Sequence, residues 1–132
     1  MNFNRFEHIN LTVRDLEASQ QFYQLLFPDW YVRAEGVDGE GDRWIHLGDD
    51  QFYLALSSAP QATRTQQPYE GISINHVGFV VKDGEALRSL LEAHHLDYYT
   101  GEAPETRLRL YVSDPDGNEI ELVEYQPSYA LR

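Results

Sequence analysis

Residues 107 to 125 read Arg-Leu-Arg-Leu-Tyr-Val-Ser-Asp-Pro-Asp-Gly-Asn-Glu-Ile-Glu-Leu-Val-Glu-Tyr. This pattern predicts two strands joined by a tight turn, because Pro115 presets φ at the first corner of the turn and Gly117 accepts a positive φ. In the second strand polar and apolar residues alternate, so Glu121 lies mid-strand on the face opposite the apolar residues. A carboxylate in that position is solvated, paired or bound to a metal, because burying it alone is costly.

The chain contains an internal repeat. Sliding the sequence by 68 residues lays His8-Ile-Asn-Leu-Thr-Val-Arg-Asp15 on His76-Val-Gly-Phe-Val-Val-Lys-Asp83, so that histidine falls on histidine and the closing basic and acidic residues are kept. Without a gap, the same offset carries Tyr53 onto Glu121. Because a repeat sets the architecture, we predict two copies of one module.

Each copy is expected to form a βαβββ module, which makes the fold class α+β. The first copy is predicted to have a strand at 6–13, a helix capped by Asp15 that runs to 26, and strands at 30–34, 43–47 and 51–57, with a loop at 35–42. The second is predicted to have a strand from 74, a helix at 84–94, and strands at 97–101, 107–113 and 118–125. We interpret residues 1–132 as one domain, with a first module at 5–57, a linker at 58–72 and a second module at 73–126.

The composition bounds the function. A chain of 132 residues suits one ordinary domain with a real core. The net charge of −12 argues against nucleic acid and anionic membranes as partners, since both attract clustered Lys and Arg. We see no apolar run of spanning length and no secretory leader, which favours a cytoplasmic location. With no cysteine, a metal site must use imidazole and carboxylate ligands.

Strand alternation predicts a polar face on each sheet, opposite the helices. The residues expected on these faces are His8, Asn10, Thr12, Tyr53, Ala55, Ser57, His76, Gly78, Val80, Arg107, Arg109, Tyr111, Ser113, Glu119, Glu121 and Val123. Two histidines at equivalent positions and one glutamate would converge there, the ligand set typical of non-haem Fe(II) and also used by Mn(II), Zn(II) and Ni(II).

The alternative for these residues is structural. A single histidine on a strand is most often a hydrogen-bonded structural residue, and Glu119, Glu121 and Glu124 would then form a solvated edge. Glu124 is expected to face away from the candidate site. We interpret the other histidines as structural or surface residues and four aromatic residues as core or interface; these are His46, His94, His95, Trp30, Trp44, Phe52 and Tyr69.

The two modules, the opening His-x-x-x-x-x-Arg/Lys-Asp of each copy and the closing Asp-Pro-Asp-Gly-Asn-x-Ile-Glu-Leu resemble the vicinal oxygen chelate superfamily. That group includes glyoxalase I, bleomycin-resistance proteins, fosfomycin-resistance enzymes and extradiol dioxygenases. The resemblance covers Phe6 to Tyr125. It implies a cupped, incomplete β-barrel with the helices outside, built around one divalent metal held by His8, His76 and Glu121.

Departures from the family pattern narrow the chemistry. The resemblance places the fourth ligand of glyoxalase I and acyl-CoA epimerases at Tyr53, which disfavours those activities. The three-ligand set is similar to that of extradiol dioxygenases and fosfomycin-resistance enzymes, and Tyr111 matches a tyrosine that both place beside the substrate. Against ring cleavage, residues 47–75 lack the expected acid–base histidine; against phosphonate binding, the loop at 101–106 is acidic, although Arg107 and Arg109 supply positive charge.

These considerations give a functional hypothesis. The chain is predicted to be a divalent-metal enzyme acting on a small oxygenated substrate, with Fe²⁺ or Mn²⁺ favoured and Zn²⁺ or Ni²⁺ as alternatives. Tyr111 would be the catalytic residue, and Tyr53, Asn10 and Arg109 would line the substrate pocket. Dioxygenase-like chemistry is preferred over fosfomycin-type epoxide opening. The competing class is a metal-free protein that sequesters a ligand, as bleomycin-resistance proteins do. The resemblance also implies a homodimer, with modules paired within one chain or across two.

Overall fold

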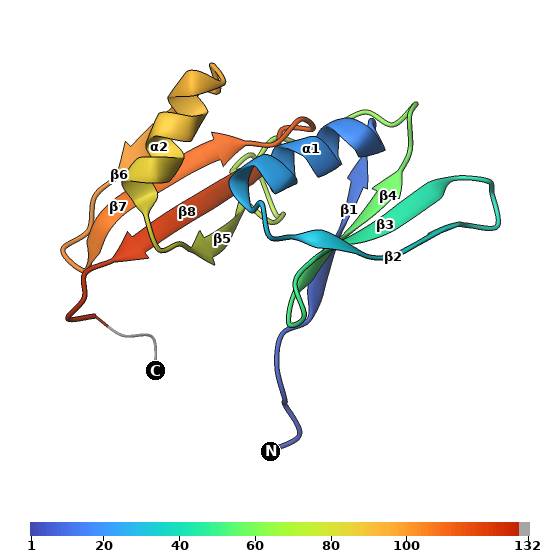
Figure 1. The fold of residues 1–132 in the computed structure, drawn as a ribbon. Coiled ribbons are helices and arrows are strands. Elements are labelled where there is room, and N and C mark those ends of the chain that lie inside the picture. The colour runs from blue at the N-terminus through green and yellow to red at the C-terminus, as the bar shows by residue number, and fades with distance from the viewer. Residues whose placement is uncertain (130–132) are drawn as a thin grey trace. The chain divides into compact units, whose positions relative to one another are not determined.

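The computed structural model describes residues 1–129, which separate into two compact units with the boundary between Arg64 and Thr65. The first unit contains β1 (His8–Val13), α1 (Leu16–Leu26), β2 (Tyr31–Val37), β3 (Arg43–Gly48) and β4 (Tyr53–Ser58). The second contains β5 (His76–Val80), α2 (Gly84–Ala93), β6 (Tyr98–Gly101), β7 (Thr106–Ser113) and β8 (Glu119–Tyr125) (Figure 1). The predicted α+β class with two βαβββ modules is therefore confirmed.

Each unit forms one four-stranded sheet with the same topology. The strand orders are β1-β4-β3-β2 and β5-β8-β7-β6. In each sheet the first strand runs parallel to the last strand of its module, and the remaining pairs are antiparallel. The cup that the family resemblance implies for the two sheets remains a prediction.

One face of each sheet is covered by the helix of its own unit. α1 packs on β3 and β4, and α2 packs on β7 and β8. The apolar residues of this layer are fully or almost fully buried; they include Phe22, Leu26, Leu47, Leu54 and Leu56 in the first unit and Leu91, Leu110, Ile120 and Leu122 in the second. We call the opposite face of each sheet its front.

Both helices begin in the same way. The Asp15 carboxylate accepts a hydrogen bond from the Ala18 N–H at 3.0 Å, and the Asp83 carboxylate accepts one from Ala86 at the same distance. Each thus satisfies one of the amide groups that a helix start leaves unpaired. The aspartate that closes the repeated sequence motif is therefore an N-cap in both modules.

The predicted turn at Asp114 to Gly117 is confirmed. Gly117 has a φ of +84° and donates its N–H to the Asp114 carbonyl at 3.0 Å. Elsewhere the predicted strand ends differ by a few residues. The largest difference is at residues 35–37, which were predicted as loop but extend β2 to Val37.

The strand register corrects the alignment of the two modules. His8 lies opposite Tyr53, whereas His76 lies opposite Glu119, so the equivalent of Tyr53 is Glu119. The ungapped offset had paired Tyr53 with Glu121. It failed because the second module is two residues shorter between its first and last strands: Tyr53 follows His8 by 45 positions, whereas Glu119 follows His76 by 43. The first-module equivalent of Glu121 is Ala55, which has no ligating atom.

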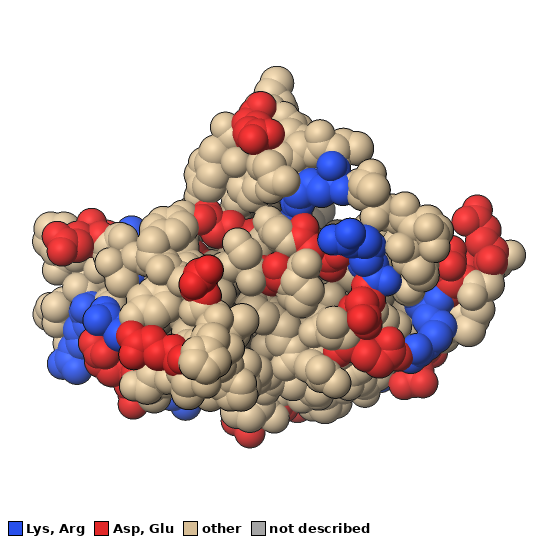
Figure 2. All heavy atoms as spheres, turned by 90° about the horizontal axis from the view of Figure 1, so that it is seen from above, with Lys and Arg blue, Asp and Glu red and all other residues tan. Residues whose placement is uncertain are grey.

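No helix within the described residues is long and apolar enough to cross a membrane. Figure 2 shows acidic and basic side chains interspersed over the visible face, consistent with a solvated surface of mixed sign despite the net charge of −12. The face offers no broad basic area of the kind that a nucleic-acid backbone attracts.

Candidate metal centre

His76 and Glu121 meet on the front of the second sheet. Their strands are adjacent, and Glu121 lies opposite Gly78, which has no side chain to separate the two. The His76 Nε2 atom is 2.9 Å from the Glu121 Oε2 atom. Glu121 is buried, whereas the His76 side chain is 35% exposed. The imidazole edge of this pair is thus open to a ligand, while its carboxylate is held in the protein.

Tyr69 and Glu119 determine which nitrogen of His76 carries the proton. The Tyr69 hydroxyl donates to the Glu119 carboxylate and lies 2.9 Å from His76 Nδ1. Because the single hydroxyl hydrogen is used by the carboxylate, the hydroxyl oxygen must accept from Nδ1–H. In a neutral ring Nε2 is then an acceptor, and it faces another acceptor in Glu121. A proton or a metal cation is needed between them.

Tyr99 completes this network. Its hydroxyl also donates to Glu119, and its ring stacks on Tyr111 with the centroids 4.6 Å apart. The hydrogen bond to Glu119, reinforced by burial, raises the pKa of Tyr69 to about 12 and raises the pKa of Tyr99 as well. Both tyrosines therefore stay protonated and keep donating to Glu119 at neutral pH.

Tyr111 and Arg109 flank the pair on β7. Tyr111 lies opposite Glu121 in the strand register and presents its ring edge-on to His76, with the centroids 5.9 Å apart. Burial, and then the Glu121 charge, raise the pKa of Tyr111, so it is a proton donor at neutral pH. The Arg109 Nε atom lies 2.9 Å from Glu121 Oε1, an ion pair by distance whose N–H is not directed at the oxygen.

His8 on the first sheet has a similar outer partner. Its Nδ1 atom lies 2.8 Å from a Glu7 carboxylate oxygen, which also accepts the Tyr53 hydroxyl at 3.1 Å. Because a carboxylate only accepts, His8 Nδ1 must carry the hydrogen, and in the neutral ring Nε2 is left with a lone pair. The hydrogen bonds from His8 and then Tyr53 lower the pKa of Glu7. The His8 ring stacks on Tyr53 with the centroids 4.7 Å apart.

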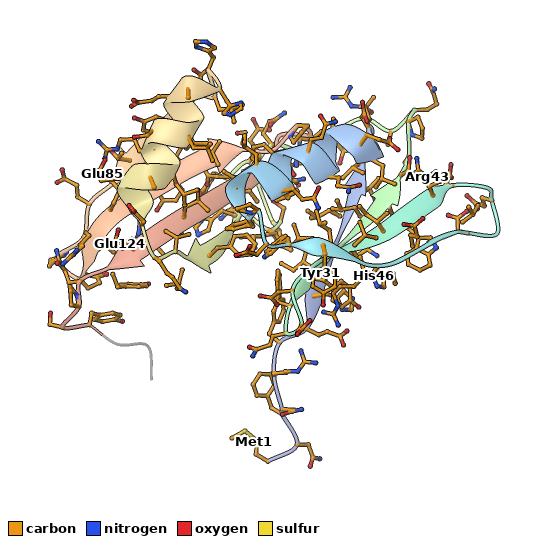
Figure 3. All side chains as sticks on the ribbon, in the orientation of Figure 1. Met1, Tyr31, Arg43, His46, Glu85 and Glu124 are labelled. Atoms are coloured by element: carbon orange, nitrogen blue, oxygen red, sulfur yellow. The ribbon has the colours of Figure 1, made fainter. Side chains whose placement is uncertain are left out.

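The structure gives a position to His46, which the sequence suggested to be a structural or surface residue. It lies on β3 opposite Ala55 (Figure 3), and its ring stacks on Tyr53 at 4.4 Å between centroids. Its ring centroid is 6.5 Å from that of His8, so it belongs to the front face. Burial, helped by the neighbouring His8 and Arg33, lowers the pKa of His46. The predicted pocket residue Asn10 is on the same face, where its side-chain oxygen accepts from the Ser57 hydroxyl at 3.2 Å.

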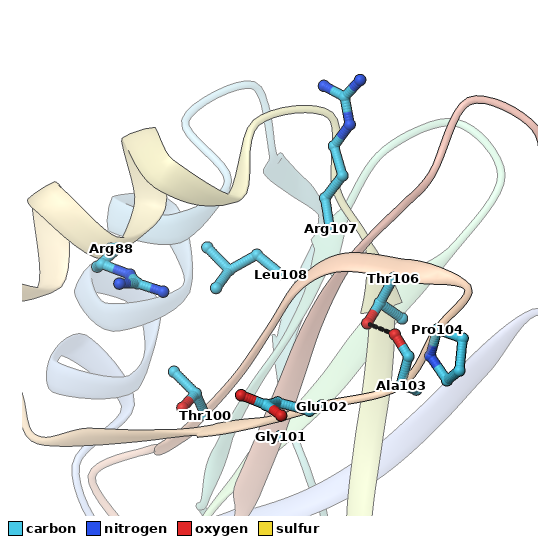
Figure 4. Close-up of a pocket in the computed structure, with 9 residues that line it drawn as sticks. All are labelled: Arg88, Thr100, Gly101, Glu102, Ala103, Pro104, Thr106, Arg107 and Leu108. Atoms are coloured by element: carbon cyan, nitrogen blue, oxygen red, sulfur yellow. Dashed lines mark hydrogen bonds between the residues drawn. The ribbon is translucent and has the colours of Figure 1, made fainter.

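Arg107 does not face the front, contrary to prediction. A register shift in β7 between Thr106 and Leu108 interrupts the alternation, and Arg107 pairs with Glu124 at 3.6 Å. Glu124 faces the helix side, as predicted, where its carboxylate accepts the Gly84 N–H at 2.9 Å (Figure 3). Figure 4 shows Arg107 next to Leu108 at a pocket formed by α2 and the β6–β7 connection, outside the candidate site.

Sequence reasoning missed several residues of this region. Tyr69 was interpreted as core or interface, and nothing in its stretch, which has no periodicity, signals its contact with His76. Tyr99 and Glu7 were not singled out, although strand register places Tyr99 opposite Tyr111. Glu119 was expected as a front-face neighbour, and that expectation is confirmed by its two tyrosine partners.

Two of the three predicted metal ligands lie next to each other. No three His, Cys, Asp or Glu side chains are grouped as metal ligands within residues 1–129. His76 and Glu121 supply two neighbouring donors in one unit, and His8 belongs to the other unit. In both histidines Nδ1 is held by an outer acceptor, the arrangement by which proteins orient a metal-binding imidazole. In His76 this directs Nε2 toward Glu121. Ala55 supplies no fourth ligand.

Comparison with known proteins agrees with the fold. Residues 5–122 match the model of the Glyoxalase/Bleomycin resistance protein/Dioxygenase superfamily, so the chain belongs to this superfamily. A search of curated proteins found no match.

Several solved structures share the fold. A glyoxalase family protein from Enterococcus faecalis has a TM-score of 0.78 and 21% identity, covering 94% of this chain and 100% of that one. The fosfomycin resistance protein FosX from Listeria monocytogenes, complexed with Mn(II) and sulfate, has a TM-score of 0.72 and 18% identity, covering 96% of both chains. TnmS3, an antibiotic binding protein from Streptomyces sp. CB03234, has a TM-score of 0.71 and 19% identity, covering 96% and 99%.

Proposed function

We propose that this chain is a divalent-metal-dependent enzyme that acts on a small oxygenated substrate. The metal would be held by Nε2 of His8, Nε2 of His76 and the carboxylate of Glu121, with Fe²⁺ or Mn²⁺ favoured by this donor set. The observation that carries the proposal is the shared state of the two histidines: each has Nδ1 engaged by an outer acceptor. A protein that only sequesters a ligand has no need for that arrangement.

The chain's own residues have distinct roles in this proposal. A bound divalent metal would polarise vicinal oxygens of the substrate. Tyr111, kept protonated by burial and by Glu121, donates a proton to the developing oxyanion. Arg109 neutralises part of the Glu121 charge, and Tyr53 and Asn10 form the wall of the pocket on the first sheet.

Within this class we favour dioxygenase-like chemistry. Such chemistry needs an acid–base histidine, and His46 offers an imidazole on the same face as His8. The second candidate within the class is fosfomycin-type epoxide opening, since the resemblance gives both chemistries the same three ligands.

A binding protein without turnover is the competing class. The observation in its favour is the aromatic platform on the first sheet, where the rings of His8, Tyr53 and His46 stack in succession. Such a platform suits a flat ligand. We also propose a homodimer, with the modules paired either within one chain or across two.

Elemental analysis of gently purified protein tests the enzyme proposal. The wild type is expected to hold near one transition-metal ion per chain and Glu121→Ala to lose it. Glu124→Ala is the matched control, since Glu124 lies on the same strand but faces the helix. Iron would direct the substrate screen to catechols with oxygen consumption, and manganese to epoxides and thiols. If the wild type binds no metal even after reconstitution, the binding-protein alternative replaces the enzyme.

A further inference from the structure

Arg33 carries a buried guanidinium nitrogen without a partner. Its Nη1 atom is excluded from solvent and has no hydrogen bond within residues 1–129. Buried N–H groups are normally satisfied, since leaving one unpaired is costly. An unsatisfied arginine nitrogen therefore calls for a partner that the polypeptide does not supply.

A β-bulge brings Arg33 to the front of the first sheet. Val32 lies opposite the buried Leu47, and Ala34 lies opposite His46, with a register shift between them. Arg33 is the extra residue at this shift, and bulges commonly redirect a side chain in this way. Its guanidinium carbon lies 4.7 Å from the centroid of the Tyr53 ring. Gly48 lies opposite Tyr53 on the strand between, where an added Cβ would come within 2.8 Å of the Tyr53 Cβ.

Two other arginines with a buried, unbonded nitrogen differ from Arg33 because each has a carboxylate nearby. Arg88 and Arg109 also have a buried Nε without a hydrogen bond, but each faces a carboxylate, at 3.6 Å from Glu85 and 2.9 Å from Glu121. Among the described residues no carboxylate forms an ion pair with Arg33. The positive charge that the sequence suggested at Arg107 and Arg109 is thus already paired, whereas that of Arg33 is available.

The surroundings of Arg33 favour an anion. The ring of Tyr53 supports the guanidinium from one side, and the His46 ring stacks on Tyr53 next to it. The carboxylate of Glu7, at the far end of the tyrosine, is engaged by His8 and the Tyr53 hydroxyl. An oxyanion at Arg33 would therefore meet a fixed cation and aromatic walls.

We propose that Arg33 binds a small oxyanion, a carboxylate or a phosphate-type group, at the front of the first sheet. The planar guanidinium matches the paired oxygens of such a group. Because His8 lies on the same face, the substrate of the proposed enzyme carries this anionic group in addition to its metal-chelating oxygens. The link to the substrate rests on the proposed function, whereas the anion site itself does not depend on metal.

A titration of metal-free protein with two probes tests the site. Inorganic phosphate and acetate are added separately, at constant pH and ionic strength, to ¹⁵N-labelled protein treated with EDTA. The Trp44 indole N–H is a local reporter, because the Trp44 ring lies 4.8 Å from that of His46. We expect saturable shifts there and in β2 to β4 with at least one probe, and at least about tenfold weaker binding in Arg33→Gln.

Two further variants sharpen the result. Arg43→Gln removes an exposed arginine that pairs with Glu17 in the same unit, and it should leave anion binding unchanged. Arg33→Lys keeps the charge but loses the planar guanidinium, so its anion affinity should lie between those of the wild type and Arg33→Gln. A dispersed ¹⁵N spectrum shows that each variant is folded. Equal binding by wild type and Arg33→Gln, or no saturable shift with either probe, would overturn the site. If the wild type binds an anion at Arg33 but no metal, the enzyme proposal fails and the anion site stands.

Discussion

The hydrogen bonds of the Nδ1 atoms of His8 and His76 determine which ring nitrogen can act as a metal ligand. Each meets an acceptor that fixes the tautomer, a carboxylate for His8 and a tyrosine oxygen for His76. The partners come from different kinds of segment: Glu7 adjoins β1, and Tyr69 lies in the connection before β5. This shared state supports the proposed role of both rings as metal ligands.

Tyr69→Phe should weaken metal binding about 10- to 100-fold, because it removes the acceptor that orients His76. The measurement is calorimetric titration of EDTA-treated protein with Mn(II). Tyr98→Phe is the matched control, since the Tyr98 hydroxyl donates to Glu92 of α2. Equal affinities in the two variants would show that Tyr69 has no such role.

Glu119→Gln should lower the pKa of both Tyr69 and Tyr99 toward the ordinary value near 10. In the wild type the hydrogen bond to Glu119 and burial raise the pKa of Tyr69 to about 12. The folded state therefore holds this proton more tightly than the unfolded state, and the associated stability is present below pH 10 and lost as pH rises through 12. Tyrosinate absorbance followed against pH, with urea unfolding at pH 9 and 11, measures both effects. Unchanged titration in Glu119→Gln would contradict the assignment.

Residue identity alone could predict only part of this site. His8, His76 and Glu121 follow from the repeat and the period-2 alternation. Tyr69 could not be found, because its segment has no periodicity and its contact depends on how that segment folds back over β5. The sheet faces of Arg33 and Arg107 could not be predicted for another reason. Each lies at a register shift, and one extra residue in a strand reverses the face that alternation predicts.

At the scale of elements, the turn between β7 and β8 sets the position of Glu121. Asp114 is 5% exposed, and its carboxylate accepts the N–H groups of Asp116 and Asn118, both at 2.9 Å. A further hydrogen bond comes from the Asn118 amide at 2.9 Å. This buried network fixes the length of the turn, and with it the residue of β8 that lies opposite Tyr111.

Asp114→Ala should lower the free energy of unfolding by about 2–3 kcal/mol, because it removes three hydrogen bonds that hold the turn. Asp83→Ala, which removes the single cap bond at the start of α2, should cost about 1 kcal/mol. Urea unfolding monitored by circular dichroism gives both values. A smaller effect at Asp114 than at Asp83 would show that the turn does not depend on this network.

The elements were largely predictable because their signals are local. Both helices begin after the predicted aspartates, and the tight turn has the glycine conformation expected. The pairing of equivalent strand positions between the two modules could not be predicted, because the modules differ in length and an ungapped comparison does not show where. The corrected equivalence matters chemically, because the position of the missing fourth ligand moves from Tyr53 to Ala55. The methyl side chain of Ala55 cannot bind a metal.

At the scale of the whole molecule, the predicted ligands are divided between two compact units of one chain. His8 lies in the first unit, and His76 and Glu121 lie in the second. The linker predicted at 58–72 contains the boundary between the units, and its second half includes Tyr69, which contacts His76. In a homodimer, a site built from both units can be completed by either chain.

Mixing His8→Ala with Glu121→Ala should restore metal binding if the units pair across chains. A heterodimer then contains one intact site, so random exchange of subunits gives about a quarter of the wild-type metal content. Mixing His76→Ala with Glu121→Ala is the control, because both lesions fall in the same unit and no exchange repairs them. Absence of restoration in the first mixture would place all three ligands in one chain.

X-ray absorption at the metal edge of manganese-loaded protein addresses the three-ligand site most directly, because multiple scattering counts the coordinated imidazoles. We expect two imidazoles with oxygen ligands in the wild type, one in His8→Ala or His76→Ala, and two in His46→Ala. A wild-type spectrum without imidazole scattering, or one that neither ligand variant changes, would contradict a metal held by His8, His76 and Glu121.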